Sequence, residues 1–315
     1  MNLTPDPTFR IGDHRYTAQQ VLLVNQVFHN EEAAYYNDLF APQLAQERDH
    51  WRALLRQAAP WLPLDATKRR WVDFGCGTGL VASVMTEFAG PLDTIYCLDL
   101  STAMLRQAQA TLASLTERPV AYLRAAGAPF QPASIDLIGL NSVLHHLPSP
   151  SDTLTELACA LKPGGLLALA HEPNRAAYTH PLIRALVTLR LVARRLRRGF
   201  SAATAAVPPP YLAQSVERIN AGGLLPWSVS AQEVVEIANI QVPHPSKPDR
   251  RRLGFDLKQI STWLPGFSRL YGDSMGMLGT YASPNRAVQT LENWLYRRYP
   301  HGGRLISGLW RKDPD

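Results

Sequence analysis

Residues 71–80 read WVDFGCGTGL, a mostly apolar run that leads into three glycines separated by single residues. The run has the length and composition of a buried β-strand, and helical spacing follows it. Glycine is favoured where a ligand comes too close to the backbone for a Cβ atom. We therefore predict a strand, a ligand-binding turn and a helix, with Gly75, Cys76, Gly77 and Gly79 in the turn.

Two carboxylates indicate which ligand this turn binds. Asp73 stands two residues before the first glycine, where it would repel a pyrophosphate but attract an ammonium or sulfonium group. The glycine spacing is GxGxG, whereas nicotinamide dehydrogenases carry GxGxxG. Asp99 ends the next predicted strand, 22 residues beyond Gly77, which suits a carboxylate that binds ribose hydroxyls.

The rest of the chain predicts an α/β fold. Short apolar runs alternate with helical stretches, which is typical of a doubly wound, mostly parallel sheet. The predicted strands cover residues 71–74, 94–98, 120–123, 135–140, 166–170, 269–281 and 304–310. We expect a Rossmann-like sheet of seven strands with helices on both faces.

Three regions are predicted along the chain. Residues 1–60 form an N-terminal helical arm, residues 61–173 and 254–315 form the α/β core, and residues 174–253 form a helical lid over the pocket. The lid is predicted because its length exceeds that of an ordinary connection in such a fold.

Two local features are predicted within these regions. The spacing of apolar residues in the arm places a helix break near His29 and Asn30. Thr153 and Glu156 have the spacing of a capping box for a later helix.

Further segments extend the pattern around the glycine turn in a fixed order. They are residues 98–105 (LDLSTAML), 128–130 (APF), 135–138 (IDLI), 144–147 (LHHL) and 161–166 (LKPGGL). Together with residues 71–80 they resemble the motifs of the class I S-adenosylmethionine (SAM) dependent methyltransferases, over about residues 71–173. The resemblance implies SAM as the cofactor and transfer of its methyl group as the reaction.

The resemblance also implies where SAM binds. Its amino acid portion would lie by Asp73 and the glycine turn, and its ribose would lie on Asp99. The other residues assigned to the cofactor are Leu100, Met104, Ala125, Ala126 and Asn141. One position departs from the family: Arg124 stands where many relatives carry an acid that contacts the adenine amine. Adenine contacts are therefore expected from the backbone of residues 125–127 or from the lid.

Candidate residues for catalysis and acceptor binding follow the later predicted strands. A base that removes a proton from the acceptor is expected among His145, His146, Glu172 and Tyr178. The expected acceptor contacts are Tyr35, Tyr36, Asn141, Asn174, Arg175, Tyr178 and Tyr211. No metal site is expected, because the three cysteines lack ligand spacing and neither neighbouring histidine has a metal partner nearby.

Three functions stay open on the sequence. A large lid favours methylation of a small-molecule acceptor, because a bulky acceptor needs an open face. A second possibility is cyclisation of SAM itself, as in azetidine-2-carboxylate synthases, which releases methylthioadenosine. A third is a non-catalytic SAM-binding protein whose basic helix docks on an acidic partner. No residue pattern in the chain decides between the first two.

Charge and composition bear on partners and location. The net charge is +6, and basic residues gather in one lid segment, at Arg184, Arg190, Arg194, Arg195, Arg197 and Arg198. This segment would form either a solvated helix face or a contact with anionic lipid or an acidic partner. A nucleic-acid partner is not expected, because the chain lacks a basic groove interleaved with aromatic residues. The absence of a signal peptide or long apolar window predicts a soluble, cytoplasmic protein.

Overall fold

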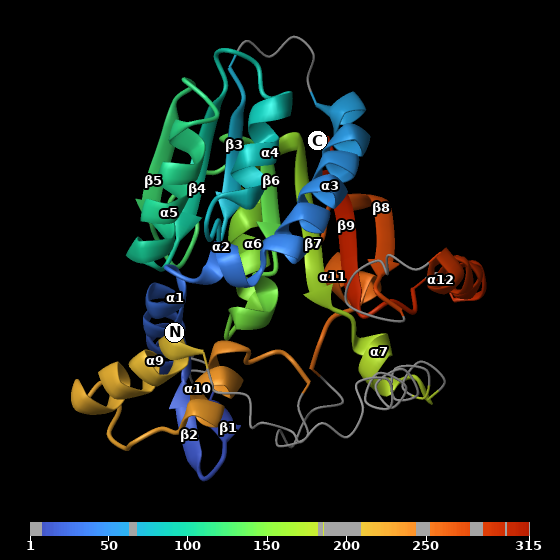
Figure 1. Cartoon of the computed structure of the whole chain (residues 1–315). Coiled ribbons are helices and arrows are strands. Elements are labelled where there is room, and N and C mark those ends of the chain that lie inside the picture. The colour runs from blue at the N-terminus through green and yellow to red at the C-terminus, as the bar shows by residue number, and fades with distance from the viewer. Residues whose placement is uncertain are drawn as a thin grey trace, which may run out of the picture.

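A central β-sheet organises the chain, of which a computed structural model describes residues 8–62, 68–181, 185, 209–243, 253–277, 286–299 and 301–314. The strand order is β5-β4-β3-β6-β7-β9-β8 (Figure 1). These strands are β3 (Arg70–Phe74), β4 (Thr94–Asp99), β5 (Val120–Arg124), β6 (Ile135–Asn141), β7 (Leu161–Pro173), β8 (Phe267–Met275) and β9 (Leu305–Lys312). Strands β3 to β7 pair in parallel, and β9 runs antiparallel to both of its neighbours. The predicted mostly parallel sheet of seven strands is confirmed.

Helices cover both faces of this sheet and its lower end (Figure 1). They are α1 (Ala18–Glu32), α2 (Tyr36–Leu39), α3 (Ala41–Ala58), α4 (Leu80–Phe88), α5 (Thr102–Ala113), α6 (Pro150–Ala160), α7 (Arg175–Thr179), α9 (Pro210–Ala221), α10 (Ala231–Ala238), α11 (Leu257–Thr262) and α12 (Arg286–Arg298). Short 3-10 turns occur at η1 (Ala59–Trp61) and η2 (Leu144–His146). None of the helices in the described ranges is long and apolar enough to span a bilayer.

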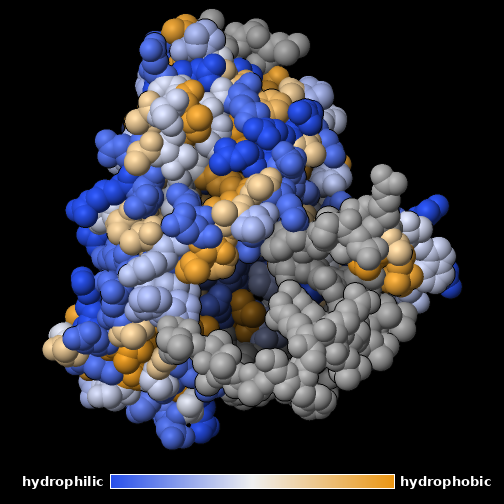
Figure 2. Space-filling model, viewed as in Figure 1, coloured by the Kyte–Doolittle hydropathy of each residue, from blue (hydrophilic) through white to orange (hydrophobic). Residues whose placement is uncertain are grey.

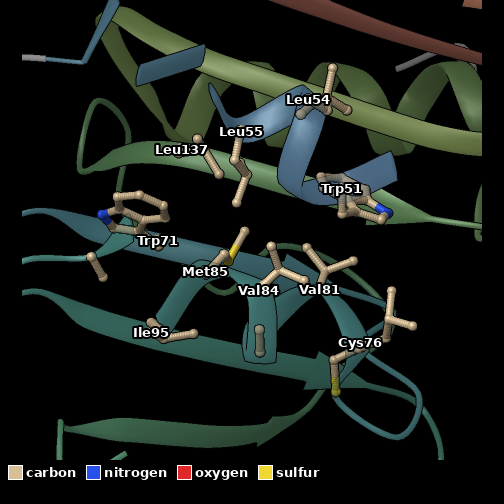
Figure 3. Close-up of a cluster of buried hydrophobic side chains, with 14 of the residues drawn as sticks. Trp51, Leu54, Leu55, Trp71, Cys76, Val81, Val84, Met85, Ile95 and Leu137 are labelled. Atoms are coloured by element: carbon tan, nitrogen blue, oxygen red, sulfur yellow. The ribbon is translucent and has the colours of Figure 1, made fainter. Parts of the chain in front are cut away.

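Alternation along the strands divides the core into two apolar layers. Trp71 of β3 packs in one layer with side chains of α3, α4 and α5, and Figure 3 shows α3 and α4 meeting the sheet there. Val72 and Phe74 belong to the other layer, together with α6 and α11. Because successive side chains of a strand point to opposite faces, Asp73 lies on the same face as Trp71, toward α4.

A second unit lies below the carboxyl ends of the parallel strands (Figure 1). It joins a hairpin of β1 (Thr8–Ile11) and β2 (His14–Thr17) to α1, α9 and α10. One apolar cluster holds these elements together and includes Tyr16, Val24, Ile219 and Ile237. The predicted arm is thus divided, since α1 packs with α9 and α10 while α3 packs on the sheet.

Two local predictions are wrong, and both errors concern helix ends. Helix α1 begins with a Thr17 capping box and continues through His29 and Asn30 to Glu32, so the break comes later than expected. Helix α6 begins at Pro150 rather than at a Thr153 cap, because the Thr153 hydroxyl donates to the Ser149 carbonyl instead.

Two other predictions fall partly or wholly outside the described residues. Of the extended stretch predicted over 269–281, the structure describes β8 and the two residues after it, and positions 278–281 lie outside. All six arginines of the predicted basic segment lie outside as well.

Candidate functional site

A cavity of about 490 Å³ opens between the carboxyl ends of the parallel strands and the unit built by α1, α9 and α10. Figure 2 shows the hollow on the face seen in Figure 1, with apolar and polar surfaces inside it. Open α/β sheets bind ligands at this end, where the strand order reverses. In this sheet the order reverses between the neighbouring strands β3 and β6. The ends of β3, β4 and β6 supply much of the cavity wall.

Most of the residues assigned to the cofactor line this cavity. Those that do are Gly75, Gly77, Asp99, Leu100, Met104, Ala125, Ala126 and Asn141. Asp73, Cys76 and Gly79 are not part of the lining. Arg124 is exposed and donates to the Leu100 carbonyl at 3.4 Å, so the cavity wall near it consists of Ala125 and Ala126.

Asp99 connects the glycine turn to the cavity. One carboxylate oxygen accepts the Gly77 N–H at 2.9 Å, and the other accepts the Ser101 N–H at 2.7 Å. Burial raises the pKa of Asp99, although these backbone donors and the nearby His29 oppose the rise. The carboxylate therefore has a fixed orientation before any ligand arrives, as a group that accepts hydroxyl hydrogen bonds requires.

The three glycines of the turn all have positive φ angles, but they serve different purposes. A Cβ on Gly75 would lie 2.5 Å from Cγ2 of Val143, and a Cβ on Gly79 would lie 3.2 Å from the Ala108 backbone. A Cβ on Gly77 would meet no atom within 4 Å in the part of the chain that the structure describes. Gly75 and Gly79 thus allow close packing, while Gly77 borders open space in which a ligand can approach the backbone.

Asp73 lies behind the glycine turn and is fully buried. One carboxylate oxygen accepts the Ala82 N–H at 2.8 Å in the first turn of α4, and the other has no hydrogen-bond partner among the residues that the structure describes. Burial raises the pKa of Asp73 from 3.8 to about 7, against the opposing effect of the Ala82 bond. A positive group near the turn would therefore be stabilised by this carboxylate.

We expect Asp73→Asn to stabilise the fold at alkaline pH. The pKa of the carboxyl is higher in the folded chain than in the unfolded one, so the folded chain loses stability as pH rises from about 4 to about 7. The variant should gain up to about 4 kcal/mol at pH 8 relative to wild type, and less at pH 5. Urea unfolding at both pH values measures this difference, and an equal change at both would contradict it.

Glu172 organises the turn that follows β6. Its Oε1 accepts the N–H groups of Val143 and Leu144 at 2.6 and 2.8 Å. Its Oε2 accepts the N–H and the ring Nδ1–H of His145 at 3.2 and 2.9 Å. The carboxylate is 0% exposed and does not line the cavity, so its contacts are those of a structural group.

The two neighbouring histidines, both candidates for the base, do line the cavity. Their ring centroids are 4.0 Å apart. His146 bonds through Nδ1 to the carbonyl of Ala238 in α10. Burial, together with the nearby His145 and His29, lowers the pKa of His146 well below its ordinary value, so this ring is neutral and donates through Nδ1.

The expected acceptor contacts divide into two groups. Tyr36, Asn141 and Tyr211 line the cavity, whereas Tyr35, Asn174, Arg175 and Tyr178 do not. Asn174 donates to the carbonyls of His301 and Gly303. Arg175 binds Asp256 and Gln259 near α11. These contacts tie the end of β7 to the last part of the core.

A polar network that includes Asn141 lines the inner end of the cavity. The Asn141 side-chain oxygen accepts from Trp51 at 2.8 Å and from His171 Nδ1 at 2.6 Å. Its amide donates to Glu47 at 2.8 Å. Burial lowers the pKa of His171 to about 3, so the ring is neutral and the Nδ1 atom is the donor. Sequence reasoning missed His171, because no strand-end motif distinguishes it from its neighbours.

Sequence reasoning also missed the face that α1 turns to the cavity. Leu22, Asn25, His29 and Glu32 line the cavity and follow one another at three- and four-residue steps. Residues with this spacing share one helix face. Polar residues among apolar ones on that face were the available signal. The predicted break at His29 concealed it, since the break ended the helical pattern before Glu32.

No group of three potential metal ligands occurs among the described residues.

Comparison with known proteins agrees with the fold and the glycine turn. These features define a Rossmann-like domain that binds a ligand at the carboxyl end of its sheet. Residues 72–169 match a family model described as "Methyltransferase domain". The chain thus carries a class I SAM-dependent methyltransferase domain, whose cofactor is S-adenosylmethionine.

The curated relatives share only this part of the chain. Trans-aconitate 2-methyltransferase of Methylobacterium radiotolerans is 39% identical over 127 residues, which is 40% of this chain and 46% of the relative. Demethylmenaquinone methyltransferase of Lactococcus lactis is 29% identical over 144 residues, which is 45% of this chain and 55% of the relative. The chain therefore spans about half the length of these relatives.

Solved structures resemble the chain at low sequence identity. Phosphoethanolamine N-methyltransferase 1 of Haemonchus contortus is 15% identical with a TM-score of 0.49, covering 95% of this chain and 50% of that chain. A SAM-dependent methyltransferase of Mesorhizobium loti is 17% identical with a TM-score of 0.44, covering 80% and 94%.

Proposed function

We propose that this protein transfers the methyl group of SAM to a small-molecule acceptor. One observation supports the proposal: both sides of the site line the same cavity. Gly77 and Asp99 line it from the sheet, and Tyr211 and Asn239 line it from the region of α9 and α10. The cofactor and a second molecule would therefore share one enclosure. Its volume of about 490 Å³ falls within the range of about 300 to 1,000 Å³ for ligand pockets and must hold both, so the acceptor is small.

The charges in the cavity favour an acceptor without several carboxylates. Glu32 and Asp99 are the acids in the described lining, and none of the described lining residues is a lysine or an arginine. Trans-aconitate appears in the name of one relative and is a tricarboxylate. Its carboxylates would need cationic partners in the cavity, because burying an unpaired charge is costly. A neutral or amine-bearing acceptor with an apolar body fits the described walls, which include Leu22 and Phe28.

The protein's own contribution is to align and desolvate the reactants. Bound SAM supplies a methyl group on a positively charged sulfur, a carbon already activated for in-line displacement. Asp99 would hold the ribose and the Gly77 turn would leave room for the amino acid portion. The walls of α1, α9 and α10 would exclude water from the acceptor.

The test is product analysis after purified protein is incubated with SAM alone and then with small acceptors. We expect acceptor-dependent S-adenosylhomocysteine, formed with amines or phenols and not with trans-aconitate. Asp99→Ala should abolish it, whereas Asp38→Ala, a change on α2 outside the cavity lining, should not.

Two other results would replace the proposal. Methylthioadenosine formed from SAM alone, faster than spontaneous breakdown, would indicate that SAM's own amine attacks its side chain. Thermal stabilisation by SAM without any product would indicate a binding protein that does not turn over.

A further inference from the structure

His29 and Glu32 form a pair on the cavity face of α1. His29 Nδ1 lies 3.0 Å from Glu32 Oε2, one helical turn away. Both residues line the cavity, and neither belongs to the glycine turn or to the motifs after it. A carboxylate can only accept here, so Nδ1 carries the proton, and Nε2 keeps its lone pair when the ring is neutral. The carboxylate is 6% exposed and the imidazole 22%, so the ring is the more accessible partner.

Groups from several elements surround the pair. Asp99 at the end of β4 is near enough to act on His29 electrostatically, and His146 of η2 lies with its ring centroid 4.8 Å from that of His29. Tyr211 of α9 is near enough for the charge of Glu32 to raise its pKa, after the larger effect of burial. The pair therefore sits where the ribose carboxylate, the turn after β6 and the lid meet, beside the region assigned to the cofactor.

The cavity histidines differ in basicity. Burial alone would lower the pKa of His29, but the hydrogen bond and charge of Glu32, with the charge of Asp99, outweigh it and raise the pKa. The pKa values of His146 and His171 are instead lowered by burial. His145 shares its carboxylate partner with three backbone N–H groups. Within the described ranges the Glu32 carboxylate accepts no backbone N–H, so its charge acts mainly on His29 and Tyr211.

We propose that His29, held by Glu32, is the general base of the reaction, and this inference rests on the proposed methyl transfer. The acceptor's oxygen or nitrogen would form a bond to the methyl carbon as the bond from that carbon to sulfur breaks. The electron pair of the broken bond stays on sulfur, which leaves neutral S-adenosylhomocysteine. The proton of the acceptor's O–H or N–H group passes to Nε2 of His29, and Glu32 stabilises the imidazolium that results.

The test compares His29→Asn and Glu32→Gln with a matched control, His14→Asn. His14 also faces a carboxylate, Glu233 at 3.6 Å, but it lies on β2 outside the cavity lining. With an acceptor found in the product assay, His29→Asn should lower kcat by about 100-fold or more while the affinity for S-adenosylhomocysteine changes less than about threefold. The control should match wild type in both quantities.

The pH profile tests the role of Glu32 itself. The base must be unprotonated, so kcat/KM should fall on the acid side as His29 gains a proton. Removing the carboxylate in Glu32→Gln lowers the pKa of His29, so the acid limb should move to lower pH. Titration of the imidazole ¹⁵N signals in wild type and Glu32→Gln measures the same shift without an acceptor, and unchanged binding of S-adenosylhomocysteine shows that each variant is folded.

The outcomes separate this proposal from the function on which it rests. Failure of wild type to form S-adenosylhomocysteine with any acceptor overturns the methyl transfer, and the base proposal with it. If wild type turns over normally and the kcat of His29→Asn stays within about threefold of the wild-type value, the base proposal alone is overturned. A His29 signal whose pKa does not fall in Glu32→Gln overturns the pairing whether or not an acceptor is known.

Discussion

Gly77→Ala is expected to weaken the binding of S-adenosylhomocysteine by about 100-fold or more, which corresponds to about 2.8 kcal/mol. The added Cβ would meet no described atom within 4 Å, and we expect it to project into the space in which the ligand approaches the backbone. The chain should stay folded, since alanine at a φ of 51° costs only about 1 to 2 kcal/mol. Isothermal titration calorimetry measures the affinity, and thermal unfolding measures the stability.

Gly79→Ala is the matched control for this experiment. Its φ is 87°, and its Cβ would lie 3.2 Å from Ala108, away from the cavity lining. We expect it to destabilise the fold at least as much as Gly77→Ala and to leave the affinity of the folded fraction nearly unchanged. Equal affinities for the folded Gly77→Ala variant and wild type would show that the ligand does not approach this turn.

Glu172→Ala is expected to destabilise the fold by about 3 to 5 kcal/mol. The change leaves three buried backbone N–H groups and the His145 ring without their acceptor, and each buried donor left unpaired costs about 1 to 3 kcal/mol. Some of these donors would regain partners as the turn relaxes, so the costs do not add in full. Urea unfolding at neutral pH measures the loss.

Glu156→Ala provides the comparison for Glu172. Glu156 is an exposed glutamate on α6 that accepts one N–H, from Ala128, at 3.4 Å. Its replacement should cost less than about 1 kcal/mol. A Glu172→Ala variant that is as stable as Glu156→Ala but inactive would return Glu172 to the catalytic role predicted from its place after the strand expected over residues 166–170.

Helix α1 shows how one misplaced boundary hides a site. The apolar spacing of the arm correctly indicated helices, but helix ends are set by caps and tertiary contacts as well as by spacing. The Thr17 capping box starts α1, and packing on α9 and α10 carries it on to Glu32. Only with that last turn formed do His29 and Glu32 stand on one face.

Local patterns were enough to predict the sheet and the glycine turn, and the resemblance of the ordered segments to a known family predicted the cofactor class. Strand runs and the φ angles that glycine permits are properties of a few neighbouring residues. Asp99 was also accessible in this way, since its place at a strand end fixes the edge of the sheet on which it lies.

The contacts of the polar side chains near that turn could not be predicted from local patterns, because they depend on tertiary packing. Asp73 meets α4 because that helix covers its face of β3, and Glu172 is enclosed because the turn after β6 folds over it. The cavity's second wall joins α1 to α9 and α10, nearly 200 residues apart in the sequence, so no local pattern specifies it. Such contacts depend on how distant segments pack together, and packing decides which buried polar groups find partners and which face the ligand.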